Sequence, residues 1–302
     1  MEPEGESQRP VVVRSLVGKK NLPFYLQCLR TLLDMCRDSI RLALHEDGTL
    51  DDEDRETVAT VLGETQIIPR EEGESRTLEA LSPYPEARRI REESIWGMEF
   101  FDPLFAEPEP FSFYVDADIL FLRPFVGLFR SEVLEGRCIF LRDIVWHAYS
   151  ILPSHLRGPQ PRPRVAKGIT TAVVCWDKRL IDWEYVEWFL SQPQFRSIPE
   201  WTLPTLQAGL ALSANGHAVD PRQIVNAYPR AQVTGEAFGV HLLGSYRKQW
   251  LPAAEEEARQ ATDESDADPS TCRFLPCEPC GALELGLNQL KRRINNRLGL
   301  LW

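Results

Sequence analysis

The feature that most constrains the fold is the segment from Phe111 to Phe125, which reads FSFYVDADILFLRPF. It is an almost unbroken apolar run that two acids, Asp116 and Asp118, interrupt at its centre. Apolar runs of this kind are buried in folded proteins, whereas unpaired carboxylates are costly to bury. A strand that passes through the core and surfaces at its C-terminal end satisfies both demands.

The spacing of the two aspartates predicts a metal site. Residues i and i+2 of an extended strand point to the same side, so we expect Asp116 and Asp118 to face one point. Two carboxylates held that close repel each other unless a cation lies between them, and a divalent ion with oxygen ligands is the usual solution. Most Asp-x-Asp pairs in acidic proteins are solvated turns, but the apolar surroundings favour a functional site here.

Length and composition set the class of protein. The chain has 302 residues, 43% of them hydrophobic, with eight tryptophans, which is enough for one large α/β domain or two smaller ones. The formal net charge of -11 argues against nucleic-acid binding, which needs a basic surface. Residues 1–10 are polar and predict a flexible N-terminus, and no apolar run reaches membrane-spanning length, so we expect a cytoplasmic protein.

The N-terminal part alternates strand and helix patterns. Residues 11–17 predict a strand, a loop with Gly18 and Lys20 follows, and apolar residues at helical spacing predict a helix over residues 22–36. Such units open many nucleotide-binding α/β folds, although no phosphate-loop motif is present and lysines such as Lys20 are more often plain surface residues than ligands. Further strand patterns predict an α/β fold with a mainly parallel sheet flanked by helices.

A long charged helix is predicted over residues 85–101, directly before the Asp-x-Asp segment. Its arginines are most simply a solvated face, but Arg91 is a candidate for contacting phosphate because the helix is expected beside the metal site. After the next strand, over residues 137–141, a proline- and arginine-rich stretch at residues 147–164 predicts an active-site loop or lid.

The composition changes near the C-terminus. Residues 253–271 predict an acidic linker, so the folded domain is expected to span residues 11–252. Cys272, Cys277 and Cys280 follow and resemble part of a zinc knuckle without its fourth ligand, which leaves zinc binding open.

A basic amphipathic helix is predicted at the end of the chain. Apolar residues recur every three or four positions from Leu283 to Leu301, with Lys and Arg around them. This pattern is typical of helices that lie on anionic membranes or bind a partner, and equally of helices that dock on their own domain.

Taken in order, several motifs resemble those of the GT-A-fold glycosyltransferases, most closely the family-eight-like retaining group. YVDADILFLRPF is similar to the family's strand-borne DxD, and Asp143 stands where the family has an acid on the acceptor side. Gly168, after Lys167, stands at the family's Asn-Gly position, and Glu200 at the start of a later helix. HLLGSYRKQW resembles the family's HxxGxxKPW, so the resemblance covers residues 11–250.

The resemblance implies a Rossmann-like GT-A fold, with a single catalytic domain, residues 11–252, and a C-terminal tail, residues 272–302. It implies a nucleoside diphosphate sugar as donor, with UDP favoured, an unknown acceptor, and Mn²⁺ or Mg²⁺ as cofactor, since mixed carboxylate and imidazole ligands suit Mn²⁺. The implied metal ligands are Asp116, Asp118 and His241. The implied donor-binding residues are Ser15, Lys20, Arg91, Asp116, Gly168, Gly244, Arg247 and Lys248. The implied catalytic candidates are Asp143 and Glu200.

The chemistry agrees with this interpretation. A nucleoside diphosphate leaves only when its charge is offset, and a divalent ion would act there as a Lewis acid. For retaining transfer the resemblance implies a front-face mechanism, in which the leaving phosphate takes the acceptor proton. Asp143 and Glu200 would orient the acceptor or act as a base, and the sequence does not decide between these roles.

Two other functions remain compatible with the sequence. A nucleotidyltransferase of related sheet topology would need a glycine-rich basic loop after the first strand, and GKKN is a poor version of it. A non-catalytic nucleotide-binding or interaction protein would keep the fold without turnover. The replacement of the family's Asn by Lys167 and of its Gln by Trp201 is compatible with it.

Overall fold

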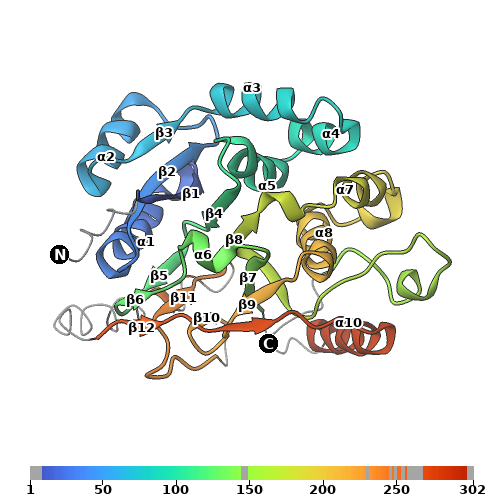
Figure 1. Ribbon diagram of the computed structural model, residues 1–302. Helices are drawn as coiled ribbons and strands as arrows, with labels where there is room; N and C mark the ends of the chain where they lie inside the picture. Colours follow the sequence, from blue (N-terminus) through green and yellow to red (C-terminus); the bar gives the residue numbers. More distant parts are fainter. Residues whose placement is uncertain are drawn as a thin grey trace, which may run out of the picture.

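A computed structural model of the chain describes residues 9–143, 149–228, 231–244, 247, 250–252, 256 and 268–297. Its centre is an eight-stranded sheet in the order β13-β9-β7-β8-β4-β1-β2-β3 (Figure 1). These strands are β1 (Val11–Val17), β2 (Ile40–Glu46), β3 (Gln66–Ile68), β4 (Phe111–Val115), β7 (Cys138–Arg142), β8 (Ile169–Asp177), β9 (His217–Val219) and β13 (Phe274–Pro276). Two small sheets contain β10 (Ile224–Asn226), β11 (Gly239–His241) and β5 (Ile119–Phe121), and β12 (Ser270–Thr271) and β6 (Phe125–Val126).

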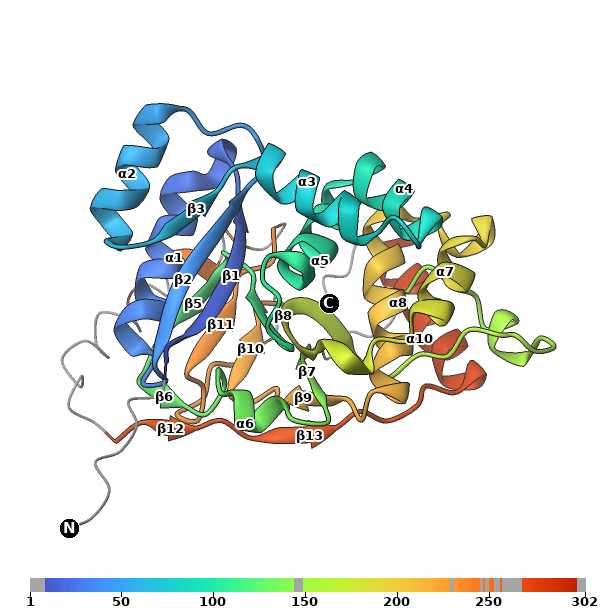
Figure 2. The same cartoon turned by 45° about the horizontal axis from the view of Figure 1, so that its top comes forward.

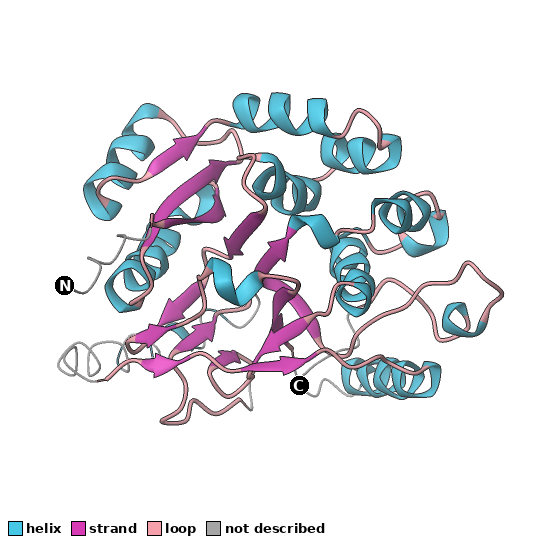
Figure 3. Cartoon of the chain, viewed as in Figure 1, coloured by secondary structure: helices cyan, strands magenta, loops and turns pink. Residues whose placement is uncertain are grey.

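The large sheet is mixed but mainly parallel. β1 pairs in parallel with β2 and β4, β2 with β3, and β7 with β9, whereas β8 runs antiparallel to both of its neighbours and β13 antiparallel to β9. Helices cover both faces, as Figure 3 shows. The predicted fold class, a mainly parallel α/β sheet flanked by helices, is confirmed.

The helices form two groups, one on each face of the sheet. The helices are α1 (Leu22–Met35), α2 (Asp52–Leu62), α3 (Arg70–Ala80), α4 (Pro85–Glu93), α5 (Ile95–Phe105), α6 (Ser131–Leu134), α7 (Trp183–Leu190), α8 (Pro199–Ser213) and α10 (Ala282–Arg297). Short 3-10 turns lie at Lys19–Asn21, His155–Arg157, Lys178–Leu180 and Pro193–Phe195. α1 and α2 pack on one face of the sheet, and α5, α7 and α8 on the other (Figure 2).

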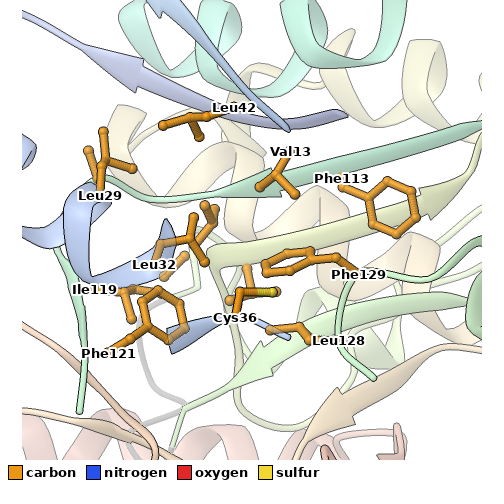
Figure 4. Close-up of a cluster of buried hydrophobic side chains, with 14 of the residues drawn as sticks. Val13, Leu29, Leu32, Cys36, Leu42, Phe113, Ile119, Phe121, Leu128 and Phe129 are labelled. Carbon is orange, nitrogen blue, oxygen red and sulfur yellow. The ribbon is translucent and has the colours of Figure 1, made fainter. Parts of the chain in front are cut away.

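Each face has its own apolar core because β1, β2 and β4 direct alternate side chains to opposite sides. Val13, Leu42 and Phe113 point toward α1, where they meet Leu29 and Leu32 (Figure 4). The opposite core joins Tyr114, Phe140 and Trp176 with side chains of α5, α7 and α8. The central apolar segment therefore lies between two cores, as its composition predicts.

The predicted helix over residues 85–101 is two helices. The hydroxyl of Ser94 accepts a hydrogen bond from the Trp96 backbone and caps a new helix, α5, so the chain changes direction between α4 and α5. Gly97 permits the close approach of the two helices, since a Cβ there would lie 2.4 Å from the carbonyl oxygen of Ile90. The periodicity of the sequence did not show this break.

The packed domain continues beyond the predicted boundary at residue 252. β12 pairs with β6, and β13 adds to the edge of the large sheet through β9, so residues 270–276 belong to the sheet system. Most of the predicted acidic linker, residues 253–271, lies outside the described residues, as do residues 1–8 of the predicted flexible N-terminus. The domain boundary predicted at residue 252 was misplaced, because the segment that follows a polar linker can pair with strands of the domain that precedes it.

The three C-terminal cysteines do not form a metal site in the described part of the chain. Cys272 packs in the core on the α1 face, whereas Cys277 and Cys280 pack with the core on the α8 face. All three are free thiols, and burial raises the pKa of Cys277 to about 12 and that of Cys280 to about 11. Their packing supports structural roles rather than zinc binding.

Across the described residues, every helix is too short or too polar to span a lipid bilayer.

Candidate metal centre and active site

The two aspartates of the central segment lie on a turn between two strands. β4 ends at Val115 and β5 begins at Ile119, so Asp116 and Asp118 are not alternate residues of one strand, as the sequence analysis had assumed. The backbone N–H of Asp116 donates to the carbonyl of Ala172 on β8, at 2.8 Å. The turn, rather than strand alternation, brings the two carboxylates to one point.

His241 reaches the same point through the small sheet. β11 runs antiparallel to β5 and pairs His241 with Ile119, the residue after Asp118. The next backbone N–H, of Leu242, donates to the carbonyl of Asp118 at 2.9 Å. A residue more than a hundred positions away in the sequence is thereby fixed against the aspartates.

The three side chains form a group suited to a metal ion. The Nε2 atom of His241 lies 3.3 Å from Oδ1 of Asp118 and 3.9 Å from Oδ2 of Asp116. One ligand atom from each residue falls within 4.8 Å of the others, and among the described residues this is the one such group of His, Cys, Asp or Glu side chains. Asp116, Asp118 and His241 therefore meet, as predicted.

Neighbouring side chains bind the carboxylate oxygens of Asp116 and Asp118 that point away from the centre of the metal group. The hydroxyl of Tyr114 donates to Oδ1 of Asp116 at 2.9 Å, and Nη2 of Arg247 donates to Oδ2 of Asp118 at 2.9 Å. Each carboxylate thus keeps one oxygen directed at His241. Such outer partners fix the orientation of metal ligands in proteins.

Asn226 determines the tautomer of His241. The amide Nδ2 of Asn226 donates to the carbonyl of Arg142 at 2.9 Å, so its Oδ1 is the atom left to accept from Nδ1–H of His241, at 2.7 Å. With the proton on Nδ1, the Nε2 atom carries a lone pair that faces the two carboxylates. A neutral imidazole with this orientation is a metal ligand.

The buried oxygen of Asp118 shows that a divalent ion fits these residues. Oδ1 of Asp118 is buried and makes no well-oriented hydrogen bond within the described structure, although it lies beside Nε2 of His241. A buried carboxylate oxygen without a hydrogen bond is costly. A divalent cation shared by Asp116, Asp118 and His241 would satisfy it, since carboxylates and a neutral imidazole are ordinary ligands of such ions.

The charges of the group are strongly coupled. Loss of hydration on burial, together with the nearby Glu99 and Asp118, raises the pKa of Asp116 well above its usual range. Burial acts to raise the pKa of Asp118 as well, but His241 and Arg247 outweigh it and hold that pKa below its usual value. Burial acts to lower the pKa of His241, yet Asp118 and Asp116 raise it. The metal-free site therefore attracts positive charge.

Arg247 lies at the edge of the metal group. Its guanidinium is 4.2 Å from the ring centroid of Phe24 and 5.6 Å from that of Tyr25, both on α1, while Nη2 contacts Asp118. Such stacking holds the planar group in one orientation. Arg247 thus lies beside the metal group, whereas Lys248 falls outside the described residues.

Asp143 and Gly168 lie together next to this group. The backbone N–H of Asp143 donates to the carbonyl of Gly168 at 2.7 Å, and the hydroxyl of Tyr228 donates to the Asp143 carboxylate at 2.9 Å. Asp143 also contributes to raising the pKa of His241, which places it within electrostatic range of the metal group. Gly168 has φ +57°, a conformation that favours glycine.

Two predicted donor-binding residues are not accessible to a ligand. The guanidinium of Arg91 forms a buried ion pair with Asp102, with Nη2 to Oδ2 at 2.9 Å and only 1% of the Arg91 side chain exposed. Ser15 is completely buried in β1. Arg91 was misassigned because its partner lies on a different helix, which the sequence pattern does not show.

Two further predicted residues are exposed. Lys20 lies on the surface in the turn after β1, and Gly244 is surrounded by open space. Neither position excludes a contact with a bound donor.

Glu200 is not placed with the metal group. It is exposed at the start of α8, and the Arg292 guanidinium on α10 lies within its electrostatic range. Gln207 is the α8 residue that lines a small cavity with Glu99 and Tyr114, roughly 10 Å further along the helix axis. The helix was predicted correctly, and the catalytic role of Glu200 stays a prediction.

Glu99 is a site residue that the sequence analysis missed. It lies on α5, hydrogen-bonds to Thr171, and lines the small cavity with Tyr114. Burial and the nearby Asp118 raise the pKa of Glu99 to about 7, while the bond to Thr171 opposes this shift. The available signal was one acid within the apolar run IWGMEFF.

No protein-family model matches the sequence, and no curated protein matches it significantly. Solved structures do match. The galactosyltransferase LgtC, in complex with donor and acceptor sugar analogues, has a TM-score of 0.53 at 11% identity, over 84% of this chain and 96% of LgtC. An active-site glutamine-to-glutamate mutant of LgtC has a TM-score of 0.52 at 10% identity, with the same shares covered.

The apo structure of WbbM, a bifunctional glycosyltransferase, has a TM-score of 0.53 at 7% identity, over 85% of this chain and 52% of WbbM. This chain thus spans about half the length of WbbM. Identities this low identify a shared architecture, which the mainly parallel sheet and its flanking helices already indicate. The chain has the GT-A fold of the glycosyltransferases that it resembles.

Proposed function

We propose that the protein is a metal-dependent glycosyltransferase. It would move a sugar from a nucleoside diphosphate donor, with UDP favoured, to an acceptor, with retention at the anomeric carbon. The observation that carries the proposal is the group of Asp116, Asp118 and His241 on a GT-A fold, with one ligand atom of each residue directed inward.

The outer partners support a metal-binding role for this group. Tyr114, Arg247 and Asn226 each bind the atom that a metal would leave unused. A group that served only as an ion pair between His241 and Asp118 would not need a second carboxylate, whose burial with a raised pKa is unfavourable. A bound divalent ion would act as a Lewis acid that offsets the charge of the leaving diphosphate.

On the donor side, Arg247 is the best placed cation. Its Nε–H is buried without a hydrogen-bond partner among the described residues, while Nη2 is bonded to Asp118. A guanidinium has several donors in a fixed plane, so Arg247 can bind phosphate oxygens and remain stacked on Phe24. Gly244, Gly168, Lys20 and Lys248 complete the proposed donor-binding set, with Gly244 leaving room for the diphosphate.

On the acceptor side, Asp143 is the better placed of the two proposed catalytic residues. Tyr228 holds its carboxylate, and it lies within electrostatic range of His241. In the proposed front-face reaction, the bond from the anomeric carbon to the leaving phosphate oxygen breaks while the bond to the acceptor oxygen forms on the same face. The acceptor proton passes to the leaving phosphate oxygen while Asp143 orients the acceptor hydroxyl. If Asp143 acts as the base instead, it takes this proton and the phosphate leaves unprotonated. Glu200, exposed on α8, would contribute only to a larger acceptor that reaches it.

Calorimetric binding of UDP and GDP tests the donor site. The titrations use the full chain with Mn²⁺ and then with excess chelator, on the wild type and on Asp118→Asn. The matched control is Asp34→Asn, which removes an exposed carboxylate paired with Arg30 on α1. We expect UDP binding that needs the metal, is lost in Asp118→Asn and persists in Asp34→Asn. Absence of UDP binding, or UDP binding that is unchanged by chelator and by Asp118→Asn, would contradict the proposal.

Turnover distinguishes the enzyme from its two alternatives. Mn²⁺-dependent release of UDP from UDP-sugars, abolished by Asp118→Asn, would support transfer. Metal-dependent UDP binding without turnover of any UDP-sugar would support a non-catalytic nucleotide-binding protein. Release of pyrophosphate from a nucleoside triphosphate in the presence of a sugar phosphate would indicate a nucleotidyltransferase.

A further inference from the structure

The C-terminal helix α10 has one face attached to the domain. Leu285 is fully buried in the core on the α8 face, and the Gln289 amide donates to the carbonyl of Ile151 at 2.8 Å. One turn further, the guanidinium of Arg292 lies 3.8 Å from the ring centroid of Trp201. These contacts come from one side of the helix and fix its rotation about its axis.

The opposite face of α10 is apolar and exposed. It carries Leu283, Leu287, Leu290 and Ile294, whose exposed fractions are 67%, 59%, 53% and 47%. The spacing of four, three and four residues aligns these side chains in one stripe, which lies roughly opposite Leu285 on the helix. Single exposed apolar residues are common, but a stripe of four large ones marks an interaction surface.

Basic residues border the stripe on both sides. Lys291 lies on one side and Arg293 and Arg297 on the other, roughly 50–90° from the centre of the stripe, and all three are exposed. Glu284, the acid within the helix, forms an ion pair with Lys167 of the domain at 2.8 Å. The exposed face is therefore locally cationic, although the whole chain has a net charge of -11.

We propose that this face of α10 binds the surface of an anionic lipid bilayer. The four apolar side chains would enter the boundary between headgroups and acyl chains, and the three flanking cations would contact lipid phosphates. Helices that lie in the membrane interface combine these same two features. The inference is independent of the proposed enzymatic function.

The charge pattern favours a membrane over a second copy of the chain. A dimer formed through two α10 stripes would bring the cations that border each stripe close together, which is unfavourable. Four side chains also provide a small area compared with the roughly 800 Å² that each partner buries in a stable protein interface. An anionic bilayer complements both the apolar stripe and its basic borders.

Vesicle flotation with the full chain tests the proposal. The protein is mixed with vesicles of phosphatidylcholine alone or of phosphatidylcholine with phosphatidylglycerol, at low and high salt. The first variant, Leu287→Glu with Leu290→Glu, removes the centre of the stripe, and the second, Lys291→Glu with Arg293→Glu, reverses two bordering charges. The matched control is Leu275→Glu, which places an acid at another exposed leucine, on β13.

We expect the wild type and Leu275→Glu to float with the anionic vesicles and to dissociate as salt is raised. The leucine variant should bind at least tenfold more weakly. The charge variant should bind more than about thirtyfold more weakly, since each of the two lost cations contributes about a fivefold gain near an anionic surface and each new carboxylate is repelled. Circular dichroism and thermal unfolding confirm that each variant is folded.

Three results would overturn the proposal. The first is failure of the folded wild type to bind anionic vesicles. The second is binding of the leucine variant and the charge variant to anionic vesicles as tight as that of the wild type. The third is wild-type binding to vesicles of phosphatidylcholine alone that is as tight as its binding to anionic vesicles. A wild-type dimer in solution that Leu287→Glu with Leu290→Glu converts to a monomer would assign the face to a second copy instead.

Discussion

The hydrogen bond from His241 to Asn226 gives the sharpest test of the metal centre. Both residues are 4% exposed, and the bond is 2.7 Å long. Asn226→Ala removes the acceptor, so the Nδ1–H of His241 and the carbonyl of Arg142 lose their partners. Each buried group left without a partner costs about 1–3 kcal/mol, so we expect the variant to be less stable by about 2–6 kcal/mol.

The same change should weaken metal binding. Loss of an outer partner of a metal-ligating histidine typically reduces metal affinity 10–100-fold, because the ring is no longer held in the ligating tautomer. At a Mn²⁺ concentration of about 100 times the wild-type Kd, bound metal raises the free energy of unfolding of the wild type by about 2.7 kcal/mol. If Asn226→Ala weakens binding about thirtyfold, the same Mn²⁺ stabilises it by only about 0.9 kcal/mol.

Urea unfolding with and without Mn²⁺ measures both effects separately. The difference between variants in chelator reports the lost hydrogen bonds, and the further difference on adding Mn²⁺ reports metal affinity. Asn226→Asp is the control for the contact with His241, because it keeps an oxygen that accepts from Nδ1–H of His241. It loses the bond to Arg142 and adds a buried carboxylate, so it should be less stable in chelator but still be stabilised by Mn²⁺ at least as much as the wild type. Equal stabilisation of wild type and Asn226→Ala by Mn²⁺ would refute the assignment of His241 as a ligand.

Three other predictions concern the surroundings of the site. Glu99 has a pKa of about 7 against an ordinary 4.5, so the folded metal-free protein binds its proton more tightly than the unfolded chain and loses stability as pH rises between these values. Glu99→Gln should remove the part of this loss that Glu99 causes, while the part caused by the raised pKa of Asp116 remains. The variant should be more stable than wild type at pH 8 by up to about 3 kcal/mol, and equal pH profiles in urea unfolding would contradict this prediction. Asp102→Ala leaves Arg91 buried without its partner and should cost about 3–5 kcal/mol, whereas a cost below 1 kcal/mol would show that the pair is hydrated. Gly97→Ala places a methyl group 2.4 Å from a backbone carbonyl of α4 and should lower the free energy of unfolding by about 2 kcal/mol, as measured by thermal unfolding. The control is Gly158→Ala, whose nearest contact is 3.6 Å and which should cost less than half of that.

The metal centre was predictable because it breaks a local rule. Two acids within an apolar run, and a histidine followed by Gly244 and Arg247 after another apolar strand, are patterns that packing alone does not explain. Their resemblance to the DxD and HxxG motifs of the GT-A glycosyltransferases was sufficient to predict that they meet. The backbone conformation that brings Asp116 and Asp118 together was not predictable, because strand alternation and a tight turn can both do so.

The errors share a different cause. Arg91 is paired with Asp102, eleven residues away on another helix, and only the break at Ser94 brings the two together. Glu99 acquires its significance from Thr171 on β8. The sequence pattern predicts that a charged residue on a helix is solvent-exposed. Its buried partners are brought close only by tertiary structure, so the pattern does not show them.

The C-terminal strands show the same limit. Ser270–Thr271 and Phe274–Pro276 have no apolar alternation, and they become strands because β6 and β9 offer unpaired edges. Pairing with an existing edge satisfies backbone groups whatever the side chains are.

This late edge strand has a consequence for biogenesis. β13 and Leu285 of α10 complete the sheet edge and the core on the α8 face, yet they follow all other strands of the large sheet in the sequence and leave the ribosome after them. During translation the nascent polypeptide exposes β9 and part of that core to solvent, and a chaperone that recognises unpaired edges would have its longest opportunity there. A stop codon placed between β11 and β12 would therefore yield a species that retains the metal ligands in sequence and is captured by chaperones or degraded, rather than a smaller working domain.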